Sequence, residues 1–189
     1  MASEKSSITI RDLQDGDLES IADIYKHAVL NTTATYELDP PSPSALGGRL
    51  HAIREAGFPC FVAENSSSSS SDMPRILGYA YASEFRPRPG YRYTVEHSIY
   101  VASSARGHGV GTLLMDALIK ACEGLGFRQM VAVIGEGGDT SPSVLFHRKL
   151  GFRYAGTLEG SGYKFGRWLD TVFMQRAING GTGSLPDST

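Results

Sequence analysis

Hydrophobic and polar residues change their spacing several times along the chain, and each change marks the boundary of a predicted element. Apolar runs and strict alternation indicate strands, whereas apolar residues that recur every three or four positions indicate helices. The predicted strands cover residues 8–11, 61–63, 76–85, 92–101, 130–134, 152–158 and 168–175. The predicted helices cover residues 18–28, which Asp15 or Asp17 can cap, 44–56, the segment from the glycine turn at 107–111 to Gly124 or Gly126, and 142–150.

The order of these elements predicts one domain with a mixed sheet. The strands before residue 101 follow one another as in hairpins, whereas those after it alternate with helices. We place this domain at residues 7–178, after a flexible N-terminus at 1–6. A Ser-rich loop at 65–74 is expected to be a flexible spacer. Residues 179–189, which are rich in Gly, Ser, Thr and Pro, are expected to form a disordered tail.

Composition and charge narrow the function classes. The chain is 41% hydrophobic and 20% charged, as is usual for a globular protein, and its formal net charge of -2 argues against a nucleic-acid binder. No apolar run approaches the roughly 20 residues that span a bilayer, and no secretion signal is visible, so we expect a cytoplasmic protein without a membrane partner. Cys60 and Cys122 are too few and too far apart for a disulfide scaffold or a zinc site, so no metal is expected.

A glycine-rich turn connects a predicted strand to a predicted helix. Residues 106–111 read Arg-Gly-His-Gly-Val-Gly. Such a turn presents several unpaired backbone N–H groups at one point, which suits a pyrophosphate, and a Cβ there would keep the phosphates away. A P-loop is excluded because no Gly-Lys-Ser/Thr follows. A dinucleotide-binding turn, which usually lies in the first βαβ unit, and a purely structural tight turn remain alternatives.

The spacing Arg106-x-x-Gly109-x-Gly111 resembles the coenzyme A pyrophosphate loop of the GCN5-related N-acetyltransferase (GNAT) superfamily. Further blocks resemble one branch of it, the phosphinothricin N-acetyltransferases, whose members also acetylate methionine sulfoximine. These blocks are residues 93–101, 131–135, 142–147, 150–152 and 162–170, and the resemblance runs from Ile8 to Arg176. It implies an α/β (α+β) fold, a single GNAT-type domain with a mixed, mostly antiparallel central sheet flanked by about four helices. It also implies acetyl-CoA as the acetyl donor, and a homodimer.

The resemblance assigns the residues that bind the donor mainly to a strand and the turn after it. The backbone of the strand would pair with the pantetheine arm, and one of its N–H groups would polarise the thioester carbonyl. The turn would hold the phosphates. The expected donor-binding residues are Ile99, Tyr100, Val101, Arg106, Gly107, His108, Gly109, Val110, Gly111, Thr112 and Ser143.

Two residues are expected to be catalytic. The resemblance makes Glu96 the general base for the substrate ammonium; the alternative is a strand-edge carboxylate that faces solvent or pairs with Arg92. It also gives His147 a share in proton transfer, since an imidazole titrates near neutral pH, although a half-buried helix histidine is the alternative. His97 should point to the opposite face of the strand from Glu96, so we leave it out of the site.

Substrate contacts are assigned to residues outside this strand. Arg88 and Tyr91 match the Arg-x-x-Tyr spacing of the family, and Arg88 could pair with a carboxylate or phosphinate unless it is a solvated loop charge. Tyr36 matches an aromatic residue of the family's substrate lid, or is a core residue. Lys164 could line the pocket, or the dimer contact together with Trp168. The family's asparagine before residue 142 is missing, with Asp139 or Thr140 as its nearest equivalent.

These observations predict an N-acetyltransferase that moves an acetyl group from acetyl-CoA to the α-amine of a small amino-acid-like substrate. Transfer should be direct, because neither cysteine has the setting of a nucleophile. Two rivals remain. One is a protein or peptide N-acetyltransferase of the same fold, and the other is a non-catalytic acyl-CoA-binding module.

Overall fold

The computed structural model describes residues 8–66 and 73–186, which form one α/β domain around a mixed sheet. Seven strands lie in the order β1-β2-β3-β4-β5-β7-β6, and every neighbouring pair is antiparallel except β4 and β5. The predicted fold class is confirmed. The strands are β1 (Ile8–Asp12), β2 (Cys60–Asn65), β3 (Ile76–Glu84), β4 (Thr94–Val101), β5 (Gln129–Gly135), β6 (Arg153–Lys164) and β7 (Arg167–Ala177).

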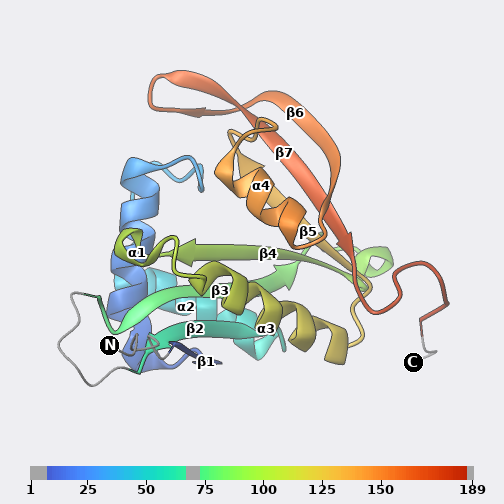
Figure 1. Cartoon of the computed structure of the whole chain (residues 1–189), viewed down its shortest axis with the longest axis horizontal. Helices are drawn as coiled ribbons and strands as arrows, with labels where there is room; N and C mark the ends of the chain where they lie inside the picture. Colours follow the sequence, from blue (N-terminus) through green and yellow to red (C-terminus); the bar gives the residue numbers. More distant parts are fainter. Residues whose placement is uncertain (1–7, 67–72, 187–189) are drawn as a thin grey trace, which may run out of the picture.

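Four α-helices cover the two faces of the sheet (Figure 1). They are α1 (Leu18–Asn31), α2 (Pro43–Glu55), α3 (Val110–Gly124) and α4 (Pro142–Lys149). Helices α1 and α2 pack on one face, around buried Ile21, Leu50 and Tyr79. Helix α3 and the start of α4 pack on the other, around Leu114, Met130 and Phe152. Burial of these apolar side chains supplies the main driving force for folding.

The residues at the N-terminal ends of α1 and α2 show which of the polar residues there cap a helix. Ser42 caps α2, because its hydroxyl accepts a hydrogen bond from the Ala45 N–H at 3.1 Å. Asp17 lies at the cap position of α1, but its carboxylate does not cap the helix. It binds the Arg11 guanidinium through both oxygens, at 2.7 and 2.8 Å, and accepts the Gln14 N–H at 2.9 Å. The first helix is therefore tied to β1 by a charge pair.

The sheet splits between β4 and β5. These strands pair only from Thr94 opposite Gln129 to His97 opposite Ala132. Beyond that point β4 continues to Val101 and β5 continues to Gly135 without pairing to each other. Parallel strands that separate in this way open a cleft between their facing edges, and the backbone groups on those edges stay free for another partner.

The last two strands are longer than the sequence pattern predicted. A register irregularity between Leu158 and Gly162 bends β6, which then continues to Lys164. The hairpin of β6 and β7 projects past α4 (Figure 1). Residues 179–186, predicted to be disordered, form turns, and Arg128 donates hydrogen bonds to the Asn179 and Leu185 carbonyls. Residues 1–6, most of the Ser-rich loop and 187–189 lie outside the described residues.

Candidate active site

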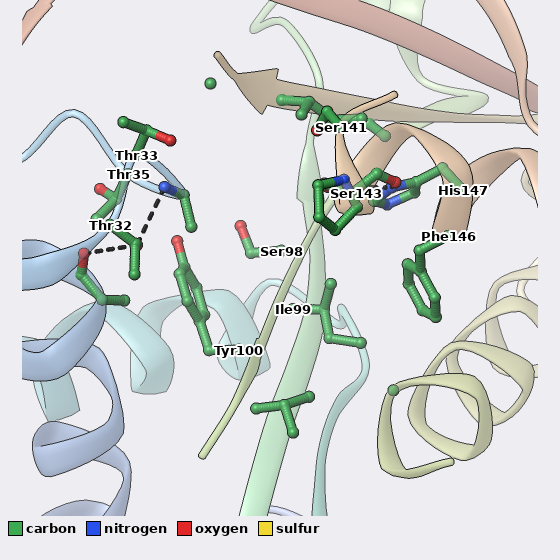
Figure 2. A pocket seen from close by; sticks show the side chains of 18 of the residues that line it. Thr32, Thr33, Thr35, Ser98, Ile99, Tyr100, Ser141, Ser143, Phe146 and His147 are labelled. Atoms are coloured by element: carbon green, nitrogen blue, oxygen red, sulfur yellow. Dashed lines mark hydrogen bonds between the residues drawn. The ribbon is translucent and has the colours of Figure 1, made fainter. Parts of the chain in front are cut away.

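A cavity of about 990 Å³ lies where β4 and β5 separate. Its walls come from the segment 32–36 after α1, the second half of β4, the glycine turn, the end of β5 and the start of α4. Figure 2 shows Ser141, Ser143 and His147 on one side and the Thr32–Thr35 segment on the other, with β4 between them. The fold thus brings residues from five separate parts of the sequence to one site.

The glycine turn forms a cradle at one end of this cavity. Gly107 and Gly109 both have φ near +80°, and Gly109 occupies the left-handed cap position of α3. No side chain caps this helix, so its first N–H groups remain available to an anion. A Cβ on either glycine would meet nothing within 4 Å, so the space above the turn is open. These features fit a pyrophosphate group.

The expected donor-binding residues lie around this cradle with one exception. Arg106, Gly107, Gly109, Thr112 and their neighbours in the turn line the cavity, as do the three residues of β4 and Ser143. His108 is exposed and is not among the lining residues; its Nδ1 lies 3.0 Å from the Arg106 carbonyl oxygen. The unpaired edge of β4 beyond His97 can take an extended ligand as an added strand.

Glu96 lines the cavity from β4 and is half-buried. Burial raises the pKa of this carboxyl, and the positive charge of Arg86 partly opposes the rise. The alternative pairing with Arg92 is not formed, because Arg92 donates to the Pro89 carbonyl at 3.1 Å and lies over the Tyr93 ring. A partly desolvated carboxylate that faces a cavity is suited to accept a proton from a bound ammonium.

His147 is buried in α4 and contacts a second buried histidine. Its Nε2 lies 3.2 Å from Nε2 of His97, and its Nδ1 lies 2.7 Å from the Ser143 carbonyl oxygen. The burial pattern agrees with the prediction that His97 occupies the opposite strand face from Glu96, but His97 also lines the cavity, which the sequence did not indicate. The cleft runs along the strand edge, so side chains from both faces of β4 border it.

Two of the expected substrate residues hold the wall of the cavity. Tyr36 lines it, donates its hydroxyl proton to the Asp170 carbonyl at 3.0 Å and accepts from Thr171 at 3.1 Å. Lys164 is only 3% exposed and donates to the Thr35 carbonyl at 2.7 Å. Burial lowers the pKa of this ammonium. Lys164 itself is not among the lining residues, so it contacts the 32–36 segment from behind.

The remaining expected substrate residues lie away from the cavity wall. Arg88 and Tyr91 are exposed in the turn before β4, and neither is among the lining residues. Tyr91 packs edge-on against Phe85, with ring centroids 5.7 Å apart. Of the two candidates for the missing asparagine, Thr140 lines the cavity, whereas Asp139 is exposed beside Arg148.

The described residues show neither a metal-binding cluster nor a membrane-spanning helix. They contain no cluster of three or more His, Cys, Asp or Glu side chains that could bind a metal ion. None of the helices in the described part of the chain is long and apolar enough to cross a bilayer.

Comparison with known proteins assigns the chain to a family. The model of the acetyltransferase (GNAT) family matches residues 21–152. Phosphinothricin N-acetyltransferase from Alcaligenes faecalis is 43% identical over 97% of this chain and 89% of its own length. L-methionine sulfoximine/L-methionine sulfone acetyltransferase from Pseudomonas aeruginosa PAO1 is 40% identical over 89% of this chain and 94% of its own.

A solved structure agrees with these relatives. The phosphinothricin acetyltransferase from Sinorhizobium meliloti, determined in complex with AcCoA, matches with a TM-score of 0.86 and 45% identity over 96% of this chain and 94% of that one. The shared fold and these identities over nearly the full length leave one conclusion. The chain belongs to the acetyltransferase (GNAT) family.

Proposed function

We propose that this protein transfers an acetyl group from acetyl-CoA to the α-amine of a small amino-acid-like substrate of the phosphinothricin or methionine sulfoximine type. The observation that carries the proposal is that a glycine cradle for phosphates and a half-buried carboxylate meet in one cavity. The names of the relatives point to the same substrate class. A module that only bound acyl-CoA would have no need of a desolvated carboxylate facing its ligand.

The proposed roles follow from the positions of the residues. Acetyl-CoA would supply an activated acetyl thioester. The N–H groups of the turn at 107–112 hold the phosphates, and the free edge of β4 aligns the rest of the donor. Glu96 takes a proton from the substrate ammonium, so that a neutral amine attacks the carbonyl carbon. The products are an amide and a free thiol, and no residue of the protein becomes acetylated.

A small substrate is supported by the wall formed by residues 32–36. Tyr36 and Lys164 tie this wall to the β6–β7 hairpin, which leaves less room for a long peptide beside Glu96. The charge of Arg86 acts on Glu96, so the turn at 86–92 lies near the end of the cavity where the amine is proposed to bind. We propose that Arg88 and Tyr91 of this turn, which do not line the cavity themselves, contact the anionic group of a substrate that extends beyond its wall.

We also propose that the protein acts as a homodimer. Trp168 is 71% exposed near the tip of the β6–β7 hairpin, where it packs edge-on against the exposed Tyr163, and the turn between the two strands carries the exposed Phe165. Clustered exposed aromatic side chains are typical of an interface rather than of a free surface. This surface, Tyr163, Phe165 and Trp168, is called the hairpin patch below.

The experiment that tests the function is a measurement of thiol release from acetyl-CoA. The purified protein is offered phosphinothricin, methionine sulfoximine, the common amino acids, polyamines and a lysine peptide, with Glu96→Gln as the matched control. We expect fast release with the first two compounds or with one amino acid, and little with the control. If thiol is released only with the lysine peptide, the protein is a peptide N-acetyltransferase and the proposed small substrate is wrong. Binding of coenzyme A without release for any amine would replace it by a non-catalytic module.

A further inference from the structure

Two buried imidazoles meet where the cleft begins. His97 is the last residue of β4 that pairs with β5, and His147 comes from α4 on the same face of the sheet. Their Nε2 atoms lie 3.2 Å apart, and the two side chains are 6% and 3% exposed. The ring of Phe152 packs edge-on against both, at centroid distances of 5.5 and 5.2 Å. The pair therefore joins the two sides of the split in a largely apolar setting.

The hydrogen-bond partners determine where the protons lie. The Ser143 carbonyl can only accept, so Nδ1 of His147, 2.7 Å away, must carry a proton. In a neutral ring Nε2 is then a bare acceptor, so the proton between the two rings belongs to Nε2 of His97. This leaves Nδ1 of His97 as an acceptor, and it is indeed buried without a partner. An unpaired buried acceptor is tolerated better than an unpaired N–H.

The opposite arrangement is disfavoured by burial. A proton on Nε2 of His147 would make that ring a cation and force an unpaired N–H on His97. No carboxylate bonds to either ring among the residues that the structure describes. Burial lowers the pKa of His97 to about 3 and also lowers the pKa of His147. Both rings are consequently neutral at physiological pH.

We propose that His97 and His147 form one neutral hydrogen-bonded pair that positions β4 against α4, and that neither ring transfers a proton during the reaction. Both nitrogens of His147 are engaged, so it offers no lone pair to a substrate ammonium. The proton that leaves the ammonium therefore goes to Glu96. Ser143, whose carbonyl His147 holds, lines the cavity, so the pair sets the position of a wall of the cleft. Both histidines are positioning residues.

The arrangement of protons can be measured without any activity. Long-range ¹H–¹⁵N spectra of the full chain labelled with ¹⁵N-histidine distinguish a protonated ring nitrogen from a bare one, and His97→Gln and His147→Gln assign the signals. We expect His147 protonated at Nδ1 and His97 at Nε2 at about pH 7 to 8, and each ring to titrate at lower pH than free histidine added to the sample. A proton on Nε2 of His147 at about pH 7 to 8, or titration of either ring at or above the pH at which free histidine titrates, would overturn the proposal.

Kinetics provide a second readout, which rests on the proposed acetyl transfer. In His147→Gln the amide oxygen can still accept from His97, so we expect kcat within about threefold of the parent and an unchanged pH profile. His147→Phe cannot accept, and should raise the KM for acetyl-CoA several-fold. Loss of a proton-transfer group costs about 10²–10⁴-fold in kcat. A loss of that size in His147→Gln, with His51→Gln on the exposed face of α2 as the control, would contradict a positioning role.

The spectra test the histidine pair and the kinetics test the proposed acetyl transfer, so either proposal can fail without the other. If no amine is acetylated by the unsubstituted protein, the proposed function is wrong, and the spectra still decide the state of the histidine pair. If acetylation occurs and His147 titrates, the proposed function stands and the positioning role is wrong.

Discussion

At the scale of single residues, burial makes the Glu96 carboxylate a stronger base than it would be in water. A carboxylate in water is too weak a base to compete for an ammonium proton, but partial removal from water destabilises its charged form. Arg86 limits this effect, because its positive charge favours the ionised carboxylate. The net result of these opposing influences is a pKa of Glu96 above its ordinary value.

The pH dependence of kcat/KM should report this balance. A general base works only when deprotonated, so the rate falls as the pH drops through the raised pKa of Glu96. Removing the opposing charge in Arg86→Gln raises that pKa further, so the acid limb should move to higher pH. In Arg88→Gln the limb should stay in place even if the substrate KM rises. Initial rates of thiol release across the pH range check both expectations, and an unmoved limb in Arg86→Gln contradicts the role of Glu96.

At this scale the sequence located Glu96 and most of the glycine turn beside the cavity, but it gave no sign that His97 also lines it. The period of two along β4 correctly separated His97 from Glu96, but it carries no information about where the sheet splits. Only the end of pairing at Ala132 shows that both faces border the same cleft. Lys164 illustrates the same limit. Its block was recognised, but the carbonyl that it holds, Thr35, lies 129 positions away in the sequence.

At the scale of elements, the two ends of α3 offer a controlled comparison. Gly109 before the helix and Gly126 after it both have positive φ, near +80° and +83°, and a Cβ at either would meet no atom within 4 Å. They differ in that Gly109 lines the cavity and Gly126 does not. Backbone strain and ligand binding can therefore be separated by the same substitution at both sites.

Gly109→Ala and Gly126→Ala should each cost about 1 kcal/mol of stability, because alanine is strained at this φ. Only Gly109→Ala should also weaken acetyl-CoA binding, by about tenfold or more, since its methyl group occupies the cradle. Urea unfolding measures the first effect, and titration calorimetry with acetyl-CoA the second. Equal binding by the two variants would show that the turn does not hold the donor.

The wall at residues 32–36 depends on two other glycines. A Cβ on Gly135 would lie 2.1 Å from the Thr33 carbonyl, and one on Gly162 would lie 2.4 Å from the Tyr36 ring. Both distances are far below contact, so the segment crosses the sheet only because these positions lack side chains. The sequence pattern showed both glycines but could not indicate that a loop from another part of the chain covers them.

Gly162→Ala should displace Tyr36 and enlarge the amine end of the cavity. We expect a loss of about 1–3 kcal/mol in stability, as for other overpacked sites. We also expect the KM for the amine to rise while the KM for acetyl-CoA changes little. Gly48→Ala, on the exposed face of α2 with nothing within 4 Å, is the control and should be neutral or stabilising. An unchanged amine KM in Gly162→Ala would show that the wall does not contact the substrate.

At the scale of the whole molecule, the hairpin of β6 and β7 contributes to the core through β7 and exposes aromatic side chains near its tip. Its tip carries the hairpin patch, whereas Leu169, Val172 and Met174 of β7 are buried in the domain. The sequence predicted both strands but ended β6 at residue 158, before the glycines at 160 and 162. In the structure they form an irregularity within a longer strand, and the strand carries the aromatic residues outward.

Charge at the hairpin patch should prevent dimer formation. Trp168→Glu places a carboxylate on the proposed apolar interface, where its desolvation would be costly. Light scattering coupled to size-exclusion chromatography should show a dimer for the unsubstituted chain and a monomer for this variant. Leu185→Glu, at a site 89% exposed in the C-terminal segment, is the matched control and should remain a dimer. If the unsubstituted chain is a monomer, the proposed homodimer is wrong.

The split between β4 and β5 has a consequence for how the protein responds to its surroundings. Four residue pairs are all that joins β1–β4 to the other three strands within the sheet. An acetyl donor that pairs with the free edge of β4 would satisfy backbone groups that β5 leaves unpaired. A ligand that binds only the folded state stabilises that state by mass action. The melting temperature of the protein would then rise with the concentration of acetyl-CoA. In a cell with little acetyl-CoA, the same chain would be more easily unfolded and degraded, so its lifetime would follow the supply of acetyl groups.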